Sequence, residues 1–381
     1  MSARNQLEWT EGDETRRARW MEEYGGRPPK RIEIADDTMN ADQAFRLASQ
    51  GTALLWRGDF HNARQLLSAL ARRAQARQSR KKADAADPAE AFNQHRLAQS
   101  QRARLLNALL IELDDTLHCA LRRAPDFSRA CAAAGVPAGE PVLLPLRAIQ
   151  GMVGSYEWRA RGVPVAGLPQ RIHPHYGVFS PIRGEYVDLV ARAPLPATDT
   201  AFDIGTGSGV LAAVLAERGI GRVIATDIDE RALACARENI ERLGLHDRID
   251  LQRTHLFPEG RSGLIVCNPP WLPARPTSTI EQAIYDPDSQ MLLGFIKGLT
   301  QHLTPDGEGW LIMSDLAERL GLRPPGFLEQ AFQGAGLRVL ERLDARPLHP
   351  KALDATDPLH EARRAEITSL WRLAQAPASK L

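Results

Sequence analysis

Residues 201–229, AFDIGTGSGVLAAVLAERGIGRVIATDID, constrain the fold more than any other stretch of the chain. The short apolar run Ala201 to Ile204 ends in a Gly-Thr-Gly-Ser-Gly turn, and apolar residues then recur at helical spacing from Val210 to Arg218. A second apolar run, Arg222 to Thr226, stops at Asp227. The pattern predicts a strand, a glycine turn, a helix and a second strand, which together make one β-α-β unit.

The glycines of this turn, Gly205, Gly207 and Gly209, permit positive φ angles and let a ligand approach the backbone closely. Asp227 follows Gly209 by 18 residues, where its carboxylate can accept hydrogen bonds from both hydroxyls of a ribose. The stretch therefore predicts a ligand that contains a nucleoside. Thr206 and Ile228, beside the same turn and strand end, are further candidates for contacting it.

Two classes of nucleoside ligand compete for such a turn. A dinucleotide fingerprint has the spacing Gly-x-Gly-x-x-Gly, with the pyrophosphate on the helix N-terminus, whereas the glycines here alternate. Asp203, two residues before the first glycine, would repel a phosphate and attract a positively charged amino group. S-adenosylmethionine carries an ammonium and a sulfonium and no phosphate, so the spacing favours it without excluding a dinucleotide.

The glycine pattern with Asp203 before it resembles that of the class I S-adenosylmethionine-dependent methyltransferases. Downstream, the apolar run Leu264 to Cys267 ends in Asn268-Pro269-Pro270-Trp271, which is similar to the Asn-Pro-Pro-aromatic motif of the amino methyltransferases. The resemblance covers about residues 173–373. It implies a Rossmann-like α/β fold with a seven-stranded, mostly parallel sheet and an antiparallel last strand. It also implies methyl transfer to an exocyclic amine of adenine or guanine, or to the amide of a glutamine side chain.

The Asn-Pro-Pro-Trp motif suits a planar amine, whose nitrogen is a poor nucleophile. The side-chain oxygen of Asn268 and the carbonyl of Pro269 are placed to accept the two hydrogens of an NH2 group, which raises electron density on nitrogen. Pro269 and Pro270 fix the backbone, and Trp271 offers a flat surface for stacking. The structural alternative for this motif is a simple turn at the end of a strand.

Two further segments are candidates for the cofactor pocket. Gly177 to Arg183 resembles the segment that precedes the cofactor motif in the glutamine methyltransferases of release factors, which implies that Phe179, Pro181 and Arg183 line the pocket. A turn that caps a helix is compatible with that role. After the third predicted strand comes His255, where relatives usually carry an acid that accepts a hydrogen bond from the adenine amino group. A neutral histidine nitrogen can accept the same bond.

At 381 residues the chain exceeds one average domain. We expect four parts: a polar N-terminal arm over 1–37, a helical domain over 38–140, a connector over 141–172 and the methyltransferase domain over 173–381. In the helical domain, apolar residues recur at helical spacing from Phe60 to Leu70. Within the connector, Val142 to Leu144 is typical of a strand.

A basic run from Arg57 to Lys82 overlaps the predicted helix around Phe60 and contains a single acid, Asp59. The basic residues are Arg57, Arg64, Arg72, Arg73, Arg77, Arg80, Lys81 and Lys82. Such a run can neutralise the phosphates of a nucleic acid, which adds affinity that depends on salt and not on base sequence. The alternative is an ordinary solvated helix face.

The composition restricts other function classes. The net charge of +1 indicates no partner for the chain as a whole, and no apolar run approaches the roughly 20 residues that span a bilayer. Because Met1 to Gly26 lacks the apolar centre of a signal peptide, we expect a cytoplasmic protein. The four cysteines show no Cys-x-x-Cys spacing, and His173-Pro174-His175 lacks a third ligand, so we expect buried cysteines and no metal.

These patterns predict an S-adenosylmethionine-dependent N-methyltransferase that acts as a monomer. The basic run favours a base in RNA, above all ribosomal RNA, as the substrate. The segment from Gly177 to Arg183 favours the alternative, a protein glutamine methyltransferase of the release-factor type. A module that binds the cofactor or RNA without catalysis is the third hypothesis.

Overall fold

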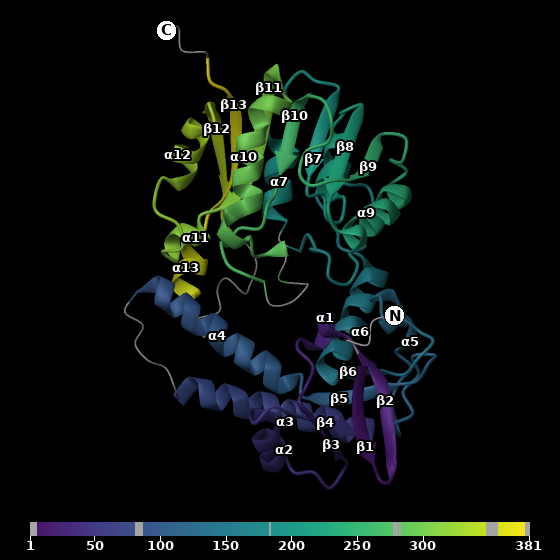
Figure 1. Cartoon of the computed structure of the whole chain (residues 1–381). Helices are drawn as coiled ribbons and strands as arrows, with labels where there is room; N and C mark the ends of the chain where they lie inside the picture. The colour runs from purple at the N-terminus through teal and green to yellow at the C-terminus, as the bar shows by residue number, and fades with distance from the viewer. Residues whose placement is uncertain are drawn as a thin grey trace. The chain divides into compact units, whose positions relative to one another are not determined.

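The structure, a computed structural model, describes residues 6–80, 87–182, 184–276, 281, 283–347 and 357–377. The chain divides into two compact units, and Figure 1 labels most of their helices and strands. The amino-terminal unit comprises the described parts of Met1–Ala86 and Asn93–Glu157. The carboxy-terminal unit comprises the described parts of Asp87–Phe92, Trp158–Pro276 and Ile280–Leu381.

A mixed sheet of seven strands forms the centre of the carboxy-terminal unit, in the order β12-β13-β11-β10-β7-β8-β9. The strands are β7 (Thr200–Ile204), β8 (Arg222–Asp227), β9 (Ile249–Arg253), β10 (Ser262–Cys267), β11 (Leu303–Ser314), β12 (Leu337–Ala345) and β13 (Thr368–Gln375). β13 runs antiparallel to both of its neighbours, whereas the remaining pairs are parallel. This is a Rossmann-like fold.

Helices cover both faces of this sheet. On one face lie α7 (Glu185–Arg192), α8 (Val210–Glu217) and α9 (Glu230–Leu243), and on the other α10 (Gln290–His302) and α12 (Phe327–Gly334). Because side chains alternate along a strand, Ala201 of β7 packs on the α8 side, and Phe202 and Ile204 pack on the α10 side. Shorter helices complete the unit: η3 (Pro287–Ser289), α11 (Leu316–Arg319) and α13 (His360–Ala365).

The amino-terminal unit is built on a sheet of six strands, in the order β1-β2-β6-β5-β4-β3. The strands are β1 (Gln6–Glu11), β2 (Glu14–Trp20), β3 (Arg31–Ala35), β4 (Thr52–Trp56), β5 (Leu109–Leu113) and β6 (Val142–Pro145). The helices are α1 (Glu22–Gly25), α2 (Ala41–Ser49), α3 (Phe60–Arg80), α5 (Ser128–Ala133), most of α4 (Pro88–Leu106) and most of α6 (Leu146–Arg161).

The expectation of a polar arm followed by a helical domain is therefore wrong. Three strands lie in the expected arm, and β4 and β5 lie in the expected helical domain. In β1 only Leu7 and Trp9 face inward, so the strand is polar at every other position and its short alternation is weak. β4 and β5 are apolar runs of five residues, which periodicity alone does not separate from a buried helix.

Other expected elements are present. α3 lies where helical spacing predicts a helix, and β6 is the strand-like stretch of the expected connector, with α6 directly after it. Residues 342–364 read in the sequence as a long polar insertion before β13, but β12 continues to Ala345. His360 of that insertion starts α13, whereas its His349 and Lys351 lie outside the described residues.

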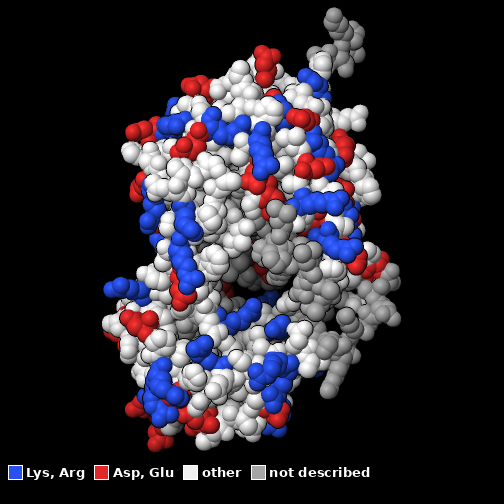
Figure 2. All heavy atoms as spheres, turned by 180° about the vertical axis from the view of Figure 1, so that it is seen from behind, with Lys and Arg blue, Asp and Glu red and all other residues white. Residues whose placement is uncertain are grey.

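Acidic and basic side chains are interspersed on the face that Figure 2 shows. The net charge of +1 therefore reflects a mixture of charges rather than an uncharged surface. Among the described residues, no helix is both long enough and apolar enough to cross a membrane.

Candidate functional site

The predicted site residues leave the sheet at one edge, from three adjacent parallel strands. The strand register sets Cys267 of β10 opposite Ile204 of β7, which in turn lies opposite Thr226 of β8. The residues that follow these three are Asn268, Gly205 and Asp227. They emerge about 4.8 Å apart from strand to strand. β8 and β9 follow on one side of β7, whereas β10 lies on its other side. Open α/β sheets bind ligands at the carboxyl ends of the strands where the strand order changes direction in this way, so this edge is the expected position of a ligand.

The glycine turn between β7 and α8 has the backbone that the sequence predicts. Gly205, Gly207 and Gly209 have φ angles of 72°, 56° and 80°, in the left-handed region that favours glycine. A β-carbon at Gly207 would meet no atom within 4 Å. At Gly209 it would lie 3.2 Å from the backbone of Ala236 in α9, which requires a small residue for packing. Gly207 thus leaves space for a ligand, while Gly209 brings the turn close to α9.

Asp203, the acid before the glycines, is 1% exposed and holds the turn from inside. Its Oδ2 accepts hydrogen bonds from the Thr206 hydroxyl at 2.6 Å and from the backbone N–H of Ala212 at 3.0 Å. No described residue donates a hydrogen bond to Oδ1 of Asp203. Burial raises the pKa of Asp203 to about 6, in spite of these two bonds. A cation that reaches Oδ1 would therefore be strongly attracted.

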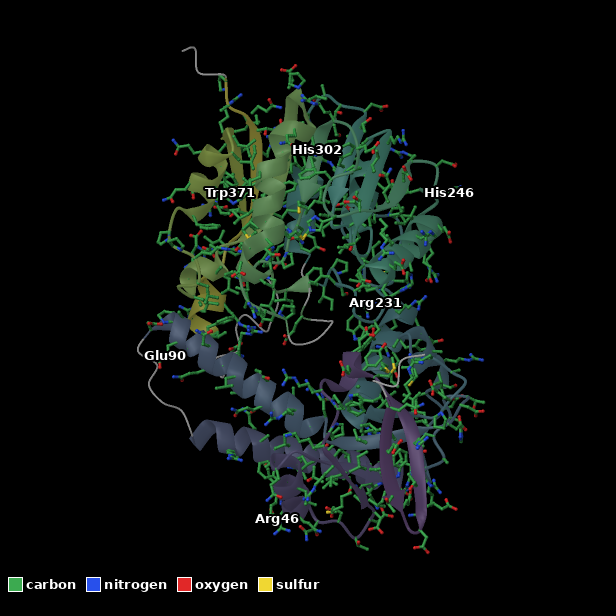
Figure 3. The ribbon with its side chains drawn as sticks, viewed as in Figure 1. Arg46, Glu90, Arg231, His246, His302 and Trp371 are labelled. Carbon is green, nitrogen blue, oxygen red and sulfur yellow. The ribbon has the colours of Figure 1, made fainter. Side chains whose placement is uncertain are left out.

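Asp227, the expected ribose ligand, also supports the turn. Its Oδ2 accepts the backbone N–H of Gly207 at 3.0 Å, and its Oδ1 accepts that of Asp229 at 2.9 Å. Burial raises the pKa of this carboxyl. The neighbouring Ile228 is 61% exposed, which is unusual for a large apolar side chain and provides a surface for an aromatic ring. α9 begins just beyond, where Figure 3 labels Arg231.

The Asn-Pro-Pro-Trp motif follows β10 directly, as the sequence predicts. Asn268 is half-buried, and its Oδ1 accepts a hydrogen bond from the Trp271 indole N–H at 2.9 Å. An amide oxygen accepts two hydrogen bonds, so one position on Oδ1 is left for a substrate. Trp271 packs against the clusters on both faces of the sheet. Its indole therefore orients Asn268, and its expected stacking role stays a prediction.

The remaining pocket candidates lie on segments next to these strands. Phe179 packs against the α8-side cluster, with its ring centroid 6.1 Å from that of Tyr186, and Pro181 is buried. Arg183 lies outside the described residues. His255 is exposed and comes two residues after β9, at the same edge of the sheet as Asp227. Cofactor contacts by these four residues stay predictions.

Asn239 of α9 is not among the predicted site residues, yet it connects three segments of the site. Its Nδ2 donates to the carbonyl of Ser208 in the glycine turn at 3.0 Å, and its Oδ1 accepts the backbone N–H of His173 at 2.7 Å. Asn239 is 1% exposed. The signal was an asparagine at a buried position of an amphipathic helix, between Cys235 and Ile240.

Arg323 is a second missed residue, and nothing in its sequence context indicates its burial. It is 5% exposed, and its Nη2 donates to the Ser289 hydroxyl at 3.0 Å. Ser289 has a φ of 56° and precedes α10, whose first N–H groups donate to both oxygens of Asp286. Asp286 donates its own N–H to Leu272, the residue after the motif, at 2.9 Å. We call Arg323, Ser289 and Asp286 the α10 entry cluster.

The first turn of α10, next to the α10 entry cluster, also contacts the glycine turn. A β-carbon at Gly205 would lie 2.5 Å from Cε of Met291, in the first turn of α10. The side chain of Met291 therefore packs on the glycine turn. Through Leu272 and Met291, the start of α10 contacts both the motif and the turn.

The cysteines and histidines have structural contacts. The four cysteines are buried and free, and burial raises the pKa of Cys131 and Cys235 to about 12. His173 Nδ1 lies 2.6 Å from the carbonyl oxygen of Arg159, and His175 Nε2 lies 3.2 Å from a carboxylate oxygen of Glu238. Within the described ranges, no group of three or more His, Cys, Asp or Glu side chains is placed to hold a metal ion.

Known proteins resemble the carboxy-terminal unit. A family model described as ribosomal protein L11 methyltransferase matches residues 191–271, from the end of α7 to Trp271. Release factor glutamine methyltransferase of Cereibacter sphaeroides is 32% identical over 179 residues, which are 43% of this chain and 63% of that protein. The carboxy-terminal unit is thus similar to class I S-adenosylmethionine-dependent methyltransferases.

Two more relatives of the chain are named for different substrates. Ribosomal protein L11 methyltransferase of Pelotomaculum thermopropionicum is 45% identical over 145 residues, 38% of this chain and 39% of that protein. The tRNA1(Val) (adenine(37)-N6)-methyltransferase of Shewanella amazonensis is 29% identical over 185 residues, 46% of this chain and 76% of that protein. The chain thus spans less than two thirds of the first two of these three relatives.

Proposed function

We propose that the chain transfers a methyl group from S-adenosylmethionine to the planar amino group of a base in RNA, with ribosomal RNA as the first choice. The observation that carries the proposal is the register of β7 and β10, which brings Asn268 next to Gly205 at the edge of the sheet. An acceptor for an amine hydrogen and a turn open to a ligand then lie on neighbouring strands. That is the arrangement a methyl transfer between two bound molecules needs.

The residues at the sheet edge fit S-adenosylmethionine better than a dinucleotide. Gly207 faces open space, Ile228 offers an apolar surface for an adenine, and Asp227 lies at the strand end for a ribose. Oδ1 of the buried Asp203 is suited to an ammonium and would repel a phosphate. When bound, the cofactor supplies an electrophilic methyl carbon, whose bond to sulfur breaks as the bond to nitrogen forms, with the electron pair left on sulfur.

The protein's part in the reaction is to orient the amine. Asn268 Oδ1 accepts one amine hydrogen on the side that the Trp271 N–H leaves open, and the carbonyl of Pro269 accepts the other. Both bonds increase the electron density on nitrogen and point its lone pair away from the motif. The nitrogen loses one proton to solvent after transfer, so no strong general base is required.

RNA is favoured as the substrate by one comparison. The relative whose length this chain covers most fully among the three, at 76%, is named as a tRNA adenine-N6 methyltransferase. The alternative is a protein glutamine, because the release factor glutamine methyltransferase matches over 179 residues at 32% identity. A module that binds cofactor or RNA without catalysis is the third possibility.

The test is methyl transfer to an extract that lacks the modification. Purified protein is incubated with radiolabelled S-adenosylmethionine and extract from a deletion strain, and the product is treated with ribonuclease or with protease. We expect ribonuclease to release the label. Label released only by protease supports the glutamine alternative, and no label beside measured cofactor binding supports the non-catalytic one.

Asn268→Ala is the matched control for this experiment. It should incorporate no label while calorimetric titration with S-adenosylhomocysteine gives an affinity close to that of the wild type. Full incorporation by this variant would remove Asn268 from the mechanism.

A further inference from the structure

The exposed face of α3 in the amino-terminal unit carries a row of polar side chains. The apolar residues Ala63, Leu66, Leu67 and Leu70 point into the core. On the opposite face, residues one helical turn apart are exposed: His61, Arg64, Gln65, Ser68 and Arg72. Helical geometry places Arg64 and Arg72, eight residues apart, about 12 Å from each other along the helix axis.

Unlike Arg57 and Arg73, these two arginines have no acidic partner among the described residues. Arg57, just before α3, pairs with Glu11 at 2.6 Å and with Glu112 at 2.5 Å, and Arg73 pairs with Asp42 at 2.9 Å. Arg64 and Arg72 form no ion pair with any described residue. The positive charges of Arg64 and Arg72 are therefore exposed, and no described acid neutralises them.

The acid nearest in sequence does not neutralise them. Asp59 has a fully buried carboxylate that accepts hydrogen bonds from Arg122 Nε at 2.8 Å and Arg123 Nε at 2.7 Å. It also accepts the backbone N–H of His61 at 2.8 Å, at the start of α3. The Arg123 guanidinium is the main reason that the pKa of Asp59 lies below its usual range. The carboxylate of Asp59 thus binds the start of α3, Arg122 and Arg123, and it does not pair with Arg64 or Arg72.

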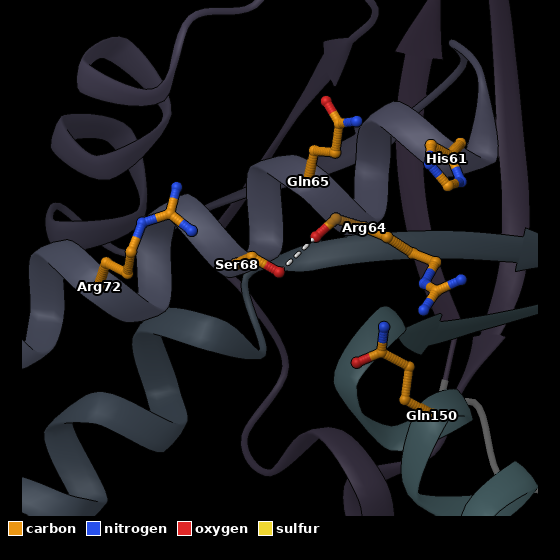
Figure 4. A pocket seen from close by; sticks show the side chains of 6 residues that line it. All are labelled: His61, Arg64, Gln65, Ser68, Arg72 and Gln150. Carbon is orange, nitrogen blue, oxygen red and sulfur yellow. Dashed lines mark hydrogen bonds between the residues drawn. The ribbon is translucent and has the colours of Figure 1, made fainter.

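The row borders a hollow of about 390 Å³, which we call the α3 hollow. Its lining consists of His61, Arg64, Gln65, Ser68, Arg72 and Gln150, without an acid among them. Figure 4 shows Arg64 extending from α3 toward Gln150 on α6. Guanidinium groups donate in a planar fork that matches phosphate oxygens, and glutamine amides both donate and accept.

We propose that the α3 hollow binds the phosphate backbone of a single-stranded segment of RNA. The inference rests on the proposed RNA substrate and names the surface that holds it away from the reacting base. Arg64 and Arg72 contact phosphates, and the amides of Gln65 and Gln150 reach a ribose hydroxyl or a base edge.

RNA fits the hollow better than an acidic protein segment does. Two guanidinium groups on one helix face match charges that repeat along a polymer, as phosphates do. The imidazole of His61 provides a flat surface on which a base stacks, and the two amides match the mixed donors and acceptors of a nucleotide. A row of carboxylates would leave the amide acceptors and the ring without a partner.

The test is the salt dependence of RNA binding by the full chain. A fluorescein-labelled single-stranded RNA of about 20 nucleotides is titrated with the wild type and with Arg64→Gln/Arg72→Gln, and anisotropy is followed. We expect about tenfold weaker binding for the double variant at moderate salt. The slope of log affinity against log salt should fall by about 1.4, since each lost phosphate contact on a single strand removes about 0.7.

Arg31→Gln/Arg46→Gln is the matched control. It removes the same charge from exposed residues of the same unit, outside the hollow, and Figure 3 labels Arg46 on α2. Equal loss of affinity in both double variants would overturn the proposal, because only net charge would then count. Polyglutamate that competes with RNA equally well would also overturn it, in favour of an acidic protein partner.

Binding is measured without methyl transfer, so the two proposals fail separately. If RNA binding falls only in Arg64→Gln/Arg72→Gln while methyl label appears in protein, the α3 hollow stands and the RNA substrate does not. If label appears in RNA while Arg64→Gln/Arg72→Gln binds as tightly as the wild type, the hollow is wrong. Thermal unfolding of the variants should match the wild type, since the substituted side chains are exposed.

Discussion

Asp203 combines two roles that conflict in the absence of a ligand. Its Oδ2 orders the glycine turn through Thr206 and Ala212, yet its carboxylate is buried and no described residue forms an ion pair with it. Burial raises its pKa from 3.8 to about 6, so the folded protein binds this proton more tightly than the unfolded chain does. Stability is therefore lost as the pH rises from about 3.8 to about 6, and the loss is complete above that range.

We predict that Asp203→Asn stabilises the ligand-free protein at pH 7.5 and weakens cofactor binding. A neutral amide removes the buried charge, which costs at most about 3 kcal/mol for a shift of this size, and the thermal midpoint should rise by a few degrees. Thermal unfolding at pH 7.5 and at pH 4.5 checks the first part, because the two proteins should converge at the lower pH. Titration with S-adenosylhomocysteine checks the second, and unchanged affinity would argue against an ammonium at Oδ1.

At the scale of elements, the α10 entry cluster connects the motif after β10 with the glycine turn after β7. Arg323 keeps Ser289 in its left-handed conformation, Asp286 caps α10, and Met291 packs on Gly205. The guanidinium forms no ion pair with a described carboxylate, and burial lowers its pKa. Burying a charge without an ion-pair partner lowers the stability of the folded protein, so Arg323 is better explained by a role in positioning Ser289 than by a role in stability.

We predict that Arg323→Met lowers the rate of methyl transfer about tenfold and changes the thermal midpoint little. Methionine fills a similar volume without the charge, but Ser289 loses its donors, so the start of α10 and its link to Leu272 become less ordered. The initial rate at saturating S-adenosylmethionine measures the effect. Arg319→Met is the control, because Arg319 of α11 pairs with Asp315, just before that helix, and not with the α10 entry cluster. If both variants lose activity equally, Arg323 has no special role.

The elements differ in how well the sequence predicts them. Strand, glycine turn, helix and acid at 201–229 are all present, because each depends on neighbouring residues and on backbone geometry. The sheet of the amino-terminal unit was missed because it depends on pairing between distant strands, such as β2 with β6. Its short strands carry little periodicity of their own.

The residues of the candidate site also differ in how well the sequence predicts them. Asn268 and Asp227 follow from their positions at strand ends, and the register places the ends of β10 and β8 on either side of the end of β7. Arg323 and Asn239 act through contacts with residues more than thirty positions away, Ser289 and Ser208. Asn239 is recognisable as a polar residue on an apolar helix stripe, whereas Arg323 lies in a loop without any pattern.

At the scale of the whole molecule, the described residues form two sheets, and the predicted cofactor contacts all belong to the unit built on one of them. Asp203, the glycine turn, Asp227 and Asn268 belong to the carboxy-terminal unit, and the α3 hollow belongs to the amino-terminal unit. A ligand that binds only the folded form stabilises the structure it contacts by RT ln(1 + [L]/Kd). The two units should therefore respond differently to the cofactor.

We predict that S-adenosylhomocysteine slows hydrogen exchange mainly in segments 203–212, 227–231 and 268–272. At a concentration of 100 times Kd the stabilisation is about 2.7 kcal/mol, so amides that exchange only after ligand release should slow about 100-fold. Amides of β1 to β5 should exchange at unchanged rates. Since the Gly207 N–H donates to Asp227, Asp227→Ala should abolish the slowing in 203–212 at the same concentration. Slowing confined to the amino-terminal unit would place the cofactor elsewhere and would contradict the assignment of the sheet edge.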